Sequence, residues 1–454
     1  MEGINQFIEH PIETQQRVLF SLLSQAKNTE YGKLHRFAEI KSYEDFNKQV
    51  PIVSYEDFEP FIEKARQGNS DVFWPGKIKH FAKSSGTTNA KSKFIPISDE
   101  SLQNCHYKAG KDLLAIYINN HRDSNLFKFK NLRLGGSAEL YESFGTKFGD
   151  LSAILIENLP FWVERTTTPS REVSLMSEWE TKLKAIVSEV KNKDVGSLTG
   201  VPSWMMVLLQ RVLKDTGKKS ISEVWPNLEV FFHGGISFVP YREQYKQLIG
   251  RDIRYYEIYN ASEGFFGIQD RFGSDEMLLM LDYGIFYEFI PMDTFGTENA
   301  KAVSLENVEL GKNYAVVIST NGGLWRYLIG DTIRFTDLKP FRFKISGRTK
   351  HYINAFGEEL MIDNVETALS KACQETNAKI TDYTGAPVYM KDGESGSHEW
   401  MIEFSTEPND FGRFSEIFDE TLKSLNSDYE AKRYNNMTLK PPIIHKARTN
   451  LFYD

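Results

Sequence analysis

The first half of the chain alternates between segments with helical spacing of apolar residues and short continuous apolar runs. Residues 179–190 show the helical spacing clearly, because apolar side chains recur every three or four positions opposite a charged face. Strands that alternate with helices favour crossover connections and a largely parallel sheet covered on both faces. The expected helices are 14–26, 179–190, 204–213 and 241–249, and the expected strands are 195–198, 228–232 and 253–259.

The pattern changes between residues 286 and 335, where glycines separate short apolar runs in the manner of antiparallel strands with tight turns. A closing segment has helices expected at 365–373 and 414–425 and strands at 381–389 and 399–404. We therefore predict an α/β fold with two domains. Residues 1–345 form a large domain of mainly parallel sheets flanked by helices, with a small barrel-like β region, and residues 346–454 form a small, mobile α+β domain.

Composition narrows the classes of partner. The 454 residues include 62 acidic and 54 basic side chains, and the net charge of -8 repels nucleic-acid backbones and anionic membranes, so we expect neither partner. Cys105 and Cys373 are too few for a disulfide framework or a cysteine metal cage. The chain also lacks a signal-peptide pattern and an apolar stretch of ~20 residues. We expect a cytoplasmic protein and take it to be a monomer.

Several familiar motifs are missing. No Gly-Lys pair is followed by serine or threonine, which excludes a Walker phosphate loop. No two glycines stand two positions apart, which disfavours a dinucleotide-binding fingerprint. The nine histidines lack zinc-protease spacing, and no Gly-x-Ser-x-Gly elbow occurs.

A hydroxyl-rich segment at residues 84–96 is the most informative chemical pattern. Small residues let backbone N–H groups converge on phosphate oxygens, and a lysine adds a charge that can follow a triphosphate. A Ser/Thr-rich surface loop has the same composition, so the segment alone leaves both interpretations open. Its residues include Ser84, Ser85, Gly86, Thr87, Thr88, Lys91 and Lys93.

Three further segments carry acidic, basic or aromatic residues at places that suit ligands. Tyr259 and Glu263 lie where a predicted strand ends, so the ring can face a base and the carboxylate can bind Mg²⁺. Asp331 can accept two ribose hydroxyls, and Arg348 can reach a ribose or phosphate oxygen. Each residue also has a structural alternative: core packing for Tyr259, a solvated side chain for Glu263, an Asx turn for Asp331 and an exposed basic linker for Arg348.

In this order and spacing the four segments resemble the adenylate-forming superfamily, which includes acyl-CoA synthetases and luciferases. The closer resemblance is to the auxin-responsive promoter family of acyl acid amido synthetases, jasmonate- and auxin-amido synthetase-like enzymes, in a bacterial-type member. It covers essentially the whole chain, including residues 31–32, 43–61 and 396–404. The resemblance implies an acid–amino acid ligase that uses ATP and Mg²⁺, with nucleotide and acyl acid bound by residues 1–345.

The resemblance also implies roles for individual residues. Tyr259 stacks on adenine beside Asn260 and Ala261, Ser262 faces the α-phosphate and Glu263 holds Mg²⁺. The implied phosphate-loop residues are Ser84, Ser85, Gly86, Thr87, Thr88 and Lys93; those of the adenine slot are Gly234 and Gly235; those at the ribose are Asp331 and Arg348. The implied catalytic residues are Lys93, Ser262 and Glu263.

Three departures from the family pattern stand out. Asn89 and Ala90 replace a glycine pair, and Leu328 stands where the third motif has arginine, with Arg326 nearby. Related chains also continue past the position of Asp454 into a basic tail, whose lysine reaches the adenylate. Either the chain is truncated before this tail or its adenylation is impaired, and we expect truncation.

The implied reaction has two steps. A substrate carboxylate attacks the α-phosphorus of ATP, and an amine then takes the acyl group after the small domain rotates about residues 348–350. The acid pocket is expected within residues 132–162. Two alternatives stay open: an acyl-CoA ligase that uses the same adenylate, and a weakly catalytic nucleotide-binding regulator.

Overall fold

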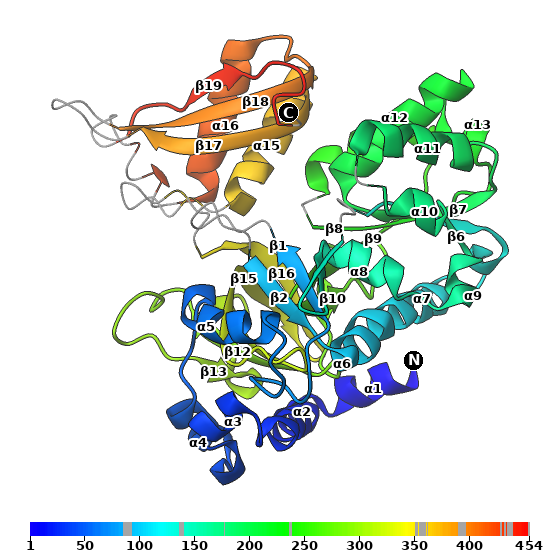
Figure 1. The fold of residues 1–454 in the computed structure, drawn as a ribbon. Coiled ribbons are helices and arrows are strands. Elements are labelled where there is room, and N and C mark those ends of the chain that lie inside the picture. The colour runs from blue at the N-terminus through cyan, green and yellow to red at the C-terminus, as the bar shows by residue number, and fades with distance from the viewer. Residues whose placement is uncertain are drawn as a thin grey trace. The chain divides into compact units, whose positions relative to one another are not determined.

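The chain forms two compact units in the computed structural model. Residues 1–236, 248–329 and 333–344 make up the first unit, and residues 237–247, 330–332 and 345–454 make up the second. Figure 1 shows their helices and strands. The division into residues 1–345 and a mobile domain at 346–454 stays a prediction. The structure describes residues 1–84, 93–135, 140–176, 178–235, 238–349, 353, 360, 362–388, 396–426, 429–430, 433 and 439–452.

Twelve strands pair edge to edge in one sheet, in the order β13-β12-β14-β15-β16-β11-β10-β9-β8-β7-β3-β6. Its parallel part runs from β6 through β3, β7 and β8 to β9. The predicted parallel strands and the helices between them are therefore confirmed, as α11 (Trp179–Val190), β7 (Val195–Gly200), α12 (Pro202–Thr216), β8 (Val230–Gly234), α14 (Arg242–Ile249) and β9 (Arg254–Ala261). The parallel part also contains β3 (Lys130–Arg133) and β6 (Thr167–Thr168), which were not predicted.

The same sheet continues beyond β9 with antiparallel strands. β9, β10, β11 and β16 pair antiparallel in that order, and β12 pairs antiparallel with β13 and β14. The antiparallel strands expected after residue 286 are confirmed, but within the described chain they extend the parallel sheet, because β9 pairs with β8 on one side and β10 on the other. Their bounds are β10 (Gly264–Ile268), β11 (Met277–Leu279), β12 (Ile285–Pro291), β13 (Val303–Ser304), β14 (Asn313–Thr320), β15 (Tyr327–Leu338) and β16 (Phe341–Arg348).

A second sheet of four short strands has the order β2-β1-β5-β4 and was not predicted. β1 (His80–Ser84) pairs antiparallel with β2 (Lys93–Ile97) and parallel with β5 (Thr146–Gly149), and β4 (Tyr141–Ser143) forms a hairpin with β5. Strands of three to five residues offer too few alternating positions for a clear period-two signal.

The N-terminal helices are tied to the large sheet by a buried polar side chain. Gln15 is 3% exposed; its Nε2 donates to the carbonyls of Leu281 and Ile285, and its Oε1 accepts from the Tyr287 N–H, each at 2.9 Å. The remaining helices before residue 310 are α1 (Glu2–Glu9), α2 (Pro11–Ala26), α3 (Glu30–Leu34), η1 (Phe37–Glu39), α4 (Tyr43–Gln49), α5 (Tyr55–Arg66), α6 (Asp99–Ser101), the π-helix η2 (Leu102–Tyr107), α7 (Lys108–Asn120), η3 (Leu126–Lys128), α8 (Leu151–Glu157), α9 (Phe161–Glu164), α10 (Arg171–Ser174), α13 (Ile221–Val224), η4 (Val239–Tyr241) and η5 (Leu305–Asn307).

A buried ion pair lies within the core of the first unit. The side chains of Arg326 and Glu288 are 3% and 1% exposed, and two N–H···O bonds of 2.8 Å join them. The other guanidinium N–H groups donate to the carbonyls of Asn47 and Val50 and to the Asn47 side chain. All five guanidinium donors are therefore used inside the protein.

In the second unit, three strands pack against two helices around an apolar core (Figure 1). β17 (Lys379–Val388) and β18 (Ser397–Thr406) are antiparallel, and β19 (Ile443–Lys446) lies parallel to β18. With α15 (Ile362–Thr376) and α16 (Phe411–Leu425), these elements confirm the predicted α+β segment. Within the described part of both units, no helix has the length and apolarity to cross a membrane.

Candidate active site

Two predicted nucleotide-binding segments lie side by side at the carboxyl ends of β8 and β9. The strands are parallel, with Gly234 paired to Ile258. A Cβ atom on Gly234 would come 2.4 Å from the Ile258 carbonyl oxygen and 3.4 Å from Oδ1 of Asn260, so only glycine permits this approach. Gly235 then turns the chain with a φ of +86°. The arrangement leaves backbone exposed where parallel strands end, which is the usual ligand edge of such sheets.

The second segment forms the hairpin between β9 and β10. Ala261 pairs with Gly264, so Ser262 and Glu263 make up a two-residue turn and both are partly exposed. The Tyr259 ring is only 7% exposed and packs on Phe266 at a centroid distance of 4.8 Å. Glu263 therefore lies at the tip of the β9–β10 hairpin, whereas most of the Tyr259 side chain is buried in the core. Its stacking on adenine stays a prediction.

The two ends of the predicted phosphate loop are brought together by β1 and β2. Ser84 is paired with Lys93 across this antiparallel pair. The Lys93 ammonium lies 5.5 Å from the centroid of the Tyr55 ring, and the Tyr55 hydroxyl accepts a hydrogen bond of 2.9 Å from the Phe94 N–H. Four of the predicted loop residues lie outside the described residues: Ser85, Gly86, Thr87 and Thr88.

The predicted ribose-binding residues pair with each other in the second unit. Nε of Arg348 lies 2.7 Å from Oδ1 of Asp331, with side-chain exposures of 46% and 15%. The Thr349 N–H donates to the Gly330 carbonyl at 2.7 Å, which holds the two segments together. The Asp331–Arg348 pair is therefore partly open to solvent, whereas Arg326 is buried. Because every donor of Arg326 is used inside the protein, it cannot take the place of the family arginine that Leu328 replaces.

Sequence reasoning did not single out Arg133, which ends β3 at the same ligand edge of the parallel sheet. It pairs with Thr199 of β7, and its Nε is buried with no hydrogen-bond partner among the residues that the structure describes. Burial lowers the pKa of Arg133 to about 10, and the charge of Glu164 offsets part of this effect. A basic residue between two leucines at a strand end is the signal that could have identified it.

The described residues include no group of three or more His, Cys, Asp or Glu side chains arranged for a metal ion. Mg²⁺ often binds through one or two carboxylates plus substrate phosphates, with water completing its shell. A single carboxylate at a partly exposed turn, Glu263, fits this mode of binding.

Comparisons with known proteins agree with the fold. Indole-3-acetic acid-amido synthetase GH3.2 of Arabidopsis thaliana is 23% identical over 458 residues, covering 85% of this chain and 83% of that protein. Jasmonoyl--L-amino acid synthetase JAR6 of Nicotiana attenuata is 26% identical over 390 residues, covering 70% and 66%. These relatives are named as amido synthetases, which are ligases.

Two solved structures share the fold of this chain. A GH3.15 acyl acid amido synthetase has a TM-score of 0.78 at 17% identity, covering 97% of this chain and 87% of that chain. A 2-hydroxyisobutyryl-CoA ligase has a TM-score of 0.61 at 14% identity, covering 96% and 86%. The predicted fold class is confirmed.

Three family domains follow one another along the sequence. Residues 1–253 match the GH3 family N-terminal domain, residues 278–348 the central domain and residues 363–454 the C-terminal domain. The first match alone spans more than half of the 454 residues. The chain therefore belongs to the GH3 family, in agreement with the resemblance that its motifs indicated.

Proposed function

We propose that this protein is an ATP-dependent acyl acid amido synthetase that joins a small carboxylic acid to an amino acid. The observation that carries the proposal is the contact between Gly234 and the segment at Ile258 and Asn260, at the ligand edge of a GH3-family sheet. Relatives named as amido synthetases support the choice of acceptor. The two free cysteines fit a cytoplasmic location, and the net charge of -8 gives no reason to expect nucleic acid as a partner.

In this proposal the adenine lies along the backbone of Gly234 and Gly235, at the carboxyl end of β8. Ser262 faces the α-phosphate from the hairpin turn. Lys93 neutralises phosphate charge from the end of β2, and the segment before it adds hydroxyl and N–H donors. Asp331 accepts the ribose hydroxyls while Arg348 orients its carboxylate across 2.7 Å.

Magnesium belongs to the same proposal. Glu263 would hold the ion together with phosphate oxygens of ATP, and the bound ion would supply charge neutralisation between two anions. The protein's own part is to present one carboxylate at the β9–β10 turn, next to the serine that faces the phosphate.

The first step joins the acid to the nucleotide. A carboxylate oxygen of the acid bonds to the α-phosphorus, the bond to the bridging oxygen breaks, and pyrophosphate leaves with that electron pair. Because carboxylate and triphosphate repel each other, the requirement is positive charge and N–H donors around the reacting atoms, which Lys93 and its loop supply. No protein nucleophile takes part.

The second step forms the amide. The amine nitrogen bonds to the acyl carbon, AMP leaves with the electron pair of the carbon–oxygen bond, and the nitrogen loses a proton. Rotation of the small domain about residues 348–350 would expose the adenylate to the amine. Arg133, a half-buried arginine at the end of β3, is placed to recognise the carboxylate of a substrate.

Product analysis tests the proposal. Full-length protein is incubated with Mg-ATP, mixed carboxylic acids and mixed amino acids or CoA, and products are identified by mass spectrometry alongside acid-dependent pyrophosphate exchange. We expect exchange with some acids and an N-acyl amino acid as product, with exchange reduced at least about tenfold in Lys93→Ala. Acyl-CoA as the product would assign the protein to the CoA ligases. ATP binding without any exchange would instead indicate a nucleotide-binding regulator.

A further inference from the structure

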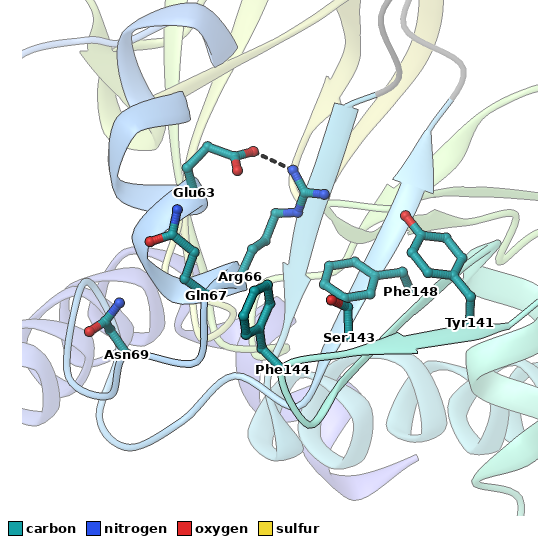
Figure 2. Close-up of a pocket in the computed structure, with 8 residues that line it drawn as sticks. All are labelled: Glu63, Arg66, Gln67, Asn69, Tyr141, Ser143, Phe144 and Phe148. Atoms are coloured by element: carbon teal, nitrogen blue, oxygen red, sulfur yellow. Dashed lines mark hydrogen bonds and ion pairs between the residues drawn. The ribbon is translucent and has the colours of Figure 1, made fainter.

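A cavity of about 510 Å³ lies between the C-terminal end of α5 and the β4–β5 hairpin of the first unit (Figure 2). Arg66 extends across it from the helix, and Tyr141, Phe144 and Phe148 face it from the hairpin. The volume lies within the range of pockets that hold small molecules. The reaction proposed above assigns no step to these residues, although the hairpin residues lie within the segment 132–162, where the acid pocket is expected.

This cavity is distinct from the predicted phosphate site. Its inner wall includes Phe148, which packs edge-on against Phe94 at a centroid distance of 5.7 Å. Phe94 and Lys93 are consecutive in β2, so their side chains leave the strand on opposite faces. Phe144 lies still farther from the loop, since its carbonyl accepts a hydrogen bond of 2.8 Å from Lys77, before β1 begins.

Phe144 has a conformation and an exposure that folding does not explain. Phe144 and Gly145 connect Ser143 to its paired residue Thr146, and their φ values are +53° and +66°. Positive φ at both central residues is the pattern of a type I′ turn, for which Asn-Gly is favoured and phenylalanine is strained. The ring is 70% exposed, so it gains little from burial. The turn therefore holds an aromatic ring at the rim of the cavity, open to solvent.

Arg66 gives the cavity a positive charge on an aromatic floor. Its guanidinium carbon lies 3.7 Å from the centroid of Phe94 and 5.1 Å from that of Phe148. Its side chain is 23% exposed, and among the described residues Glu63 is the only carboxylate that pairs with it. Tyr141 stacks on Phe148 at 5.1 Å with an interplanar angle of 17°, and its own exposure is 44%.

We propose that this cavity binds a small planar aromatic carboxylate, with the ring between Phe144 and Tyr141 and the carboxylate on Arg66. Aromatic walls favour a flat ring, and guanidinium is the side chain best shaped for a carboxylate. The Glu63 carboxylate pairs with the Arg66 guanidinium when no ligand is bound, and the carboxylate of the ligand replaces it on binding. This binding does not depend on the proposed amide synthesis and needs no ATP.

A titration with 2-naphthoate in the absence of ATP, followed by ligand NMR, tests the proposal. We expect a dissociation constant on the order of 1 mM for the wild type, as for other small ligands. Phe144→Asn should weaken binding at least about tenfold while the melting temperature stays equal or rises, because asparagine accepts the positive φ. Phe127→Asn is the matched control, since Phe127 is 69% exposed on η3, outside the cavity, and should bind like the wild type.

A second variant tests the part assigned to the charge. Glu63→Gln removes the competing carboxylate and should tighten 2-naphthoate binding by about threefold to tenfold, with no effect on the neutral 2-naphthamide. The proposal is overturned if the wild type shows no saturable binding up to about 10 mM, or if Phe144→Asn binds 2-naphthoate as well as the wild type. Weaker binding in Glu63→Gln, or equal binding of the acid and the amide, would remove Arg66 as the anion partner.

Discussion

Arg326 and Arg348 each pair with a carboxylate, but the two pairs have opposite surroundings. The Arg326–Glu288 pair is 3% and 1% exposed, whereas Arg348 and Asp331 are 46% and 15% exposed. Five internal hydrogen bonds use every donor of Arg326. In the exposed pair, Nε of Arg348 lies 2.7 Å from Oδ1 of Asp331.

This difference separates a structural arginine from one that can bind a ligand. A buried charge must be paired inside the protein, because water cannot solvate it. The hydrogen-bond donors and acceptors of such a pair are then used inside the protein and cannot bind a substrate. An exposed pair contributes little to folding and can exchange its partner for a ligand atom. Arg326 lies in the third predicted segment and Arg348 in the fourth, and their exposures set an arginine used inside the protein apart from one that is open to solvent.

The largest expected effect comes from breaking the buried pair. Glu288→Gln leaves the Arg326 guanidinium without a counter-charge. It also replaces with an NH2 donor one of the two oxygens that now accept hydrogen bonds from Arg326 and from the Tyr43 hydroxyl. We expect the free energy of unfolding to fall by about 3–5 kcal/mol. Urea unfolding followed by tryptophan fluorescence measures this change.

A double variant provides the control. Arg326→Met combined with Glu288→Leu removes both charges and should recover a large part of the lost stability, since no unpaired charge remains. If Glu288→Gln costs less than about 1 kcal/mol, the pair behaves as an exposed one and the contrast with Arg348 is wrong.

The second prediction concerns the exposed pair. Asp331→Asn should change the free energy of unfolding by less than about 1 kcal/mol, because Asp331 and Arg348 are partly solvated. If Asp331 accepts the ribose hydroxyls, losing these charge-assisted bonds should weaken ATP binding by about 1.5–3 kcal/mol, or about 10-fold to 100-fold. The KM for ATP in pyrophosphate exchange, measured beside the urea midpoint, separates the two effects. A large loss of stability with an unchanged KM would make Asp331 structural, like Glu288.

The third prediction uses a buried pair in the second unit, where Arg433 donates two hydrogen bonds to Asp419 at 2.9 and 2.7 Å. Burial alone would raise the pKa of Asp419, but hydrogen bonds from Arg433 and Tyr429 and the charge of Arg433 lower it overall. A lowered pKa in the folded state adds stability that is present above the ordinary pKa near 3.9 and is lost as the pH falls through the folded value.

The stability advantage of the wild type over Asp419→Asn should therefore shrink between about pH 4 and the acid limit, by roughly 1.4 kcal/mol for each unit of depression. Unfolding of both proteins at a series of acid pH values measures it. A difference that stays constant over this range would mean that Asp419 titrates normally.

Local pattern was enough to predict most elements of the fold. The helix expected at 204–213 is α12 (Pro202–Thr216), and its ends follow local rules: proline suits the first turn, and Gly217 ends the helix with a φ of +67°. Pairing across the sheet was harder to predict. β9 joins a parallel strand on one side and an antiparallel one on the other, and the four short strands around β1 depend on partners far along the chain.

The site could be predicted where residues able to bind a ligand lie at the ends of predicted strands. Gly234 and Asn260 lie together because β8 and β9 are neighbouring parallel strands, which the alternating pattern indicated. The role of Arg326 could not be predicted, since its partner Glu288 is 38 residues away and the depth of both depends on packing. Phe144 was missed for the opposite reason, because an aromatic residue in a short segment suggests burial and gives no sign of an exposed turn.

The three hydrogen bonds of Gln15 have a consequence for how the chain is made. Their partners follow it by 266 to 272 residues, so on the ribosome α2 is synthesised long before β12 is available to receive it. Until then its apolar side, which includes Leu19, Leu22 and Leu23, has no site to occupy and is exposed to chaperones and to other nascent chains. During that interval, capture of this helix by another chain can interfere with synthesis of the protein.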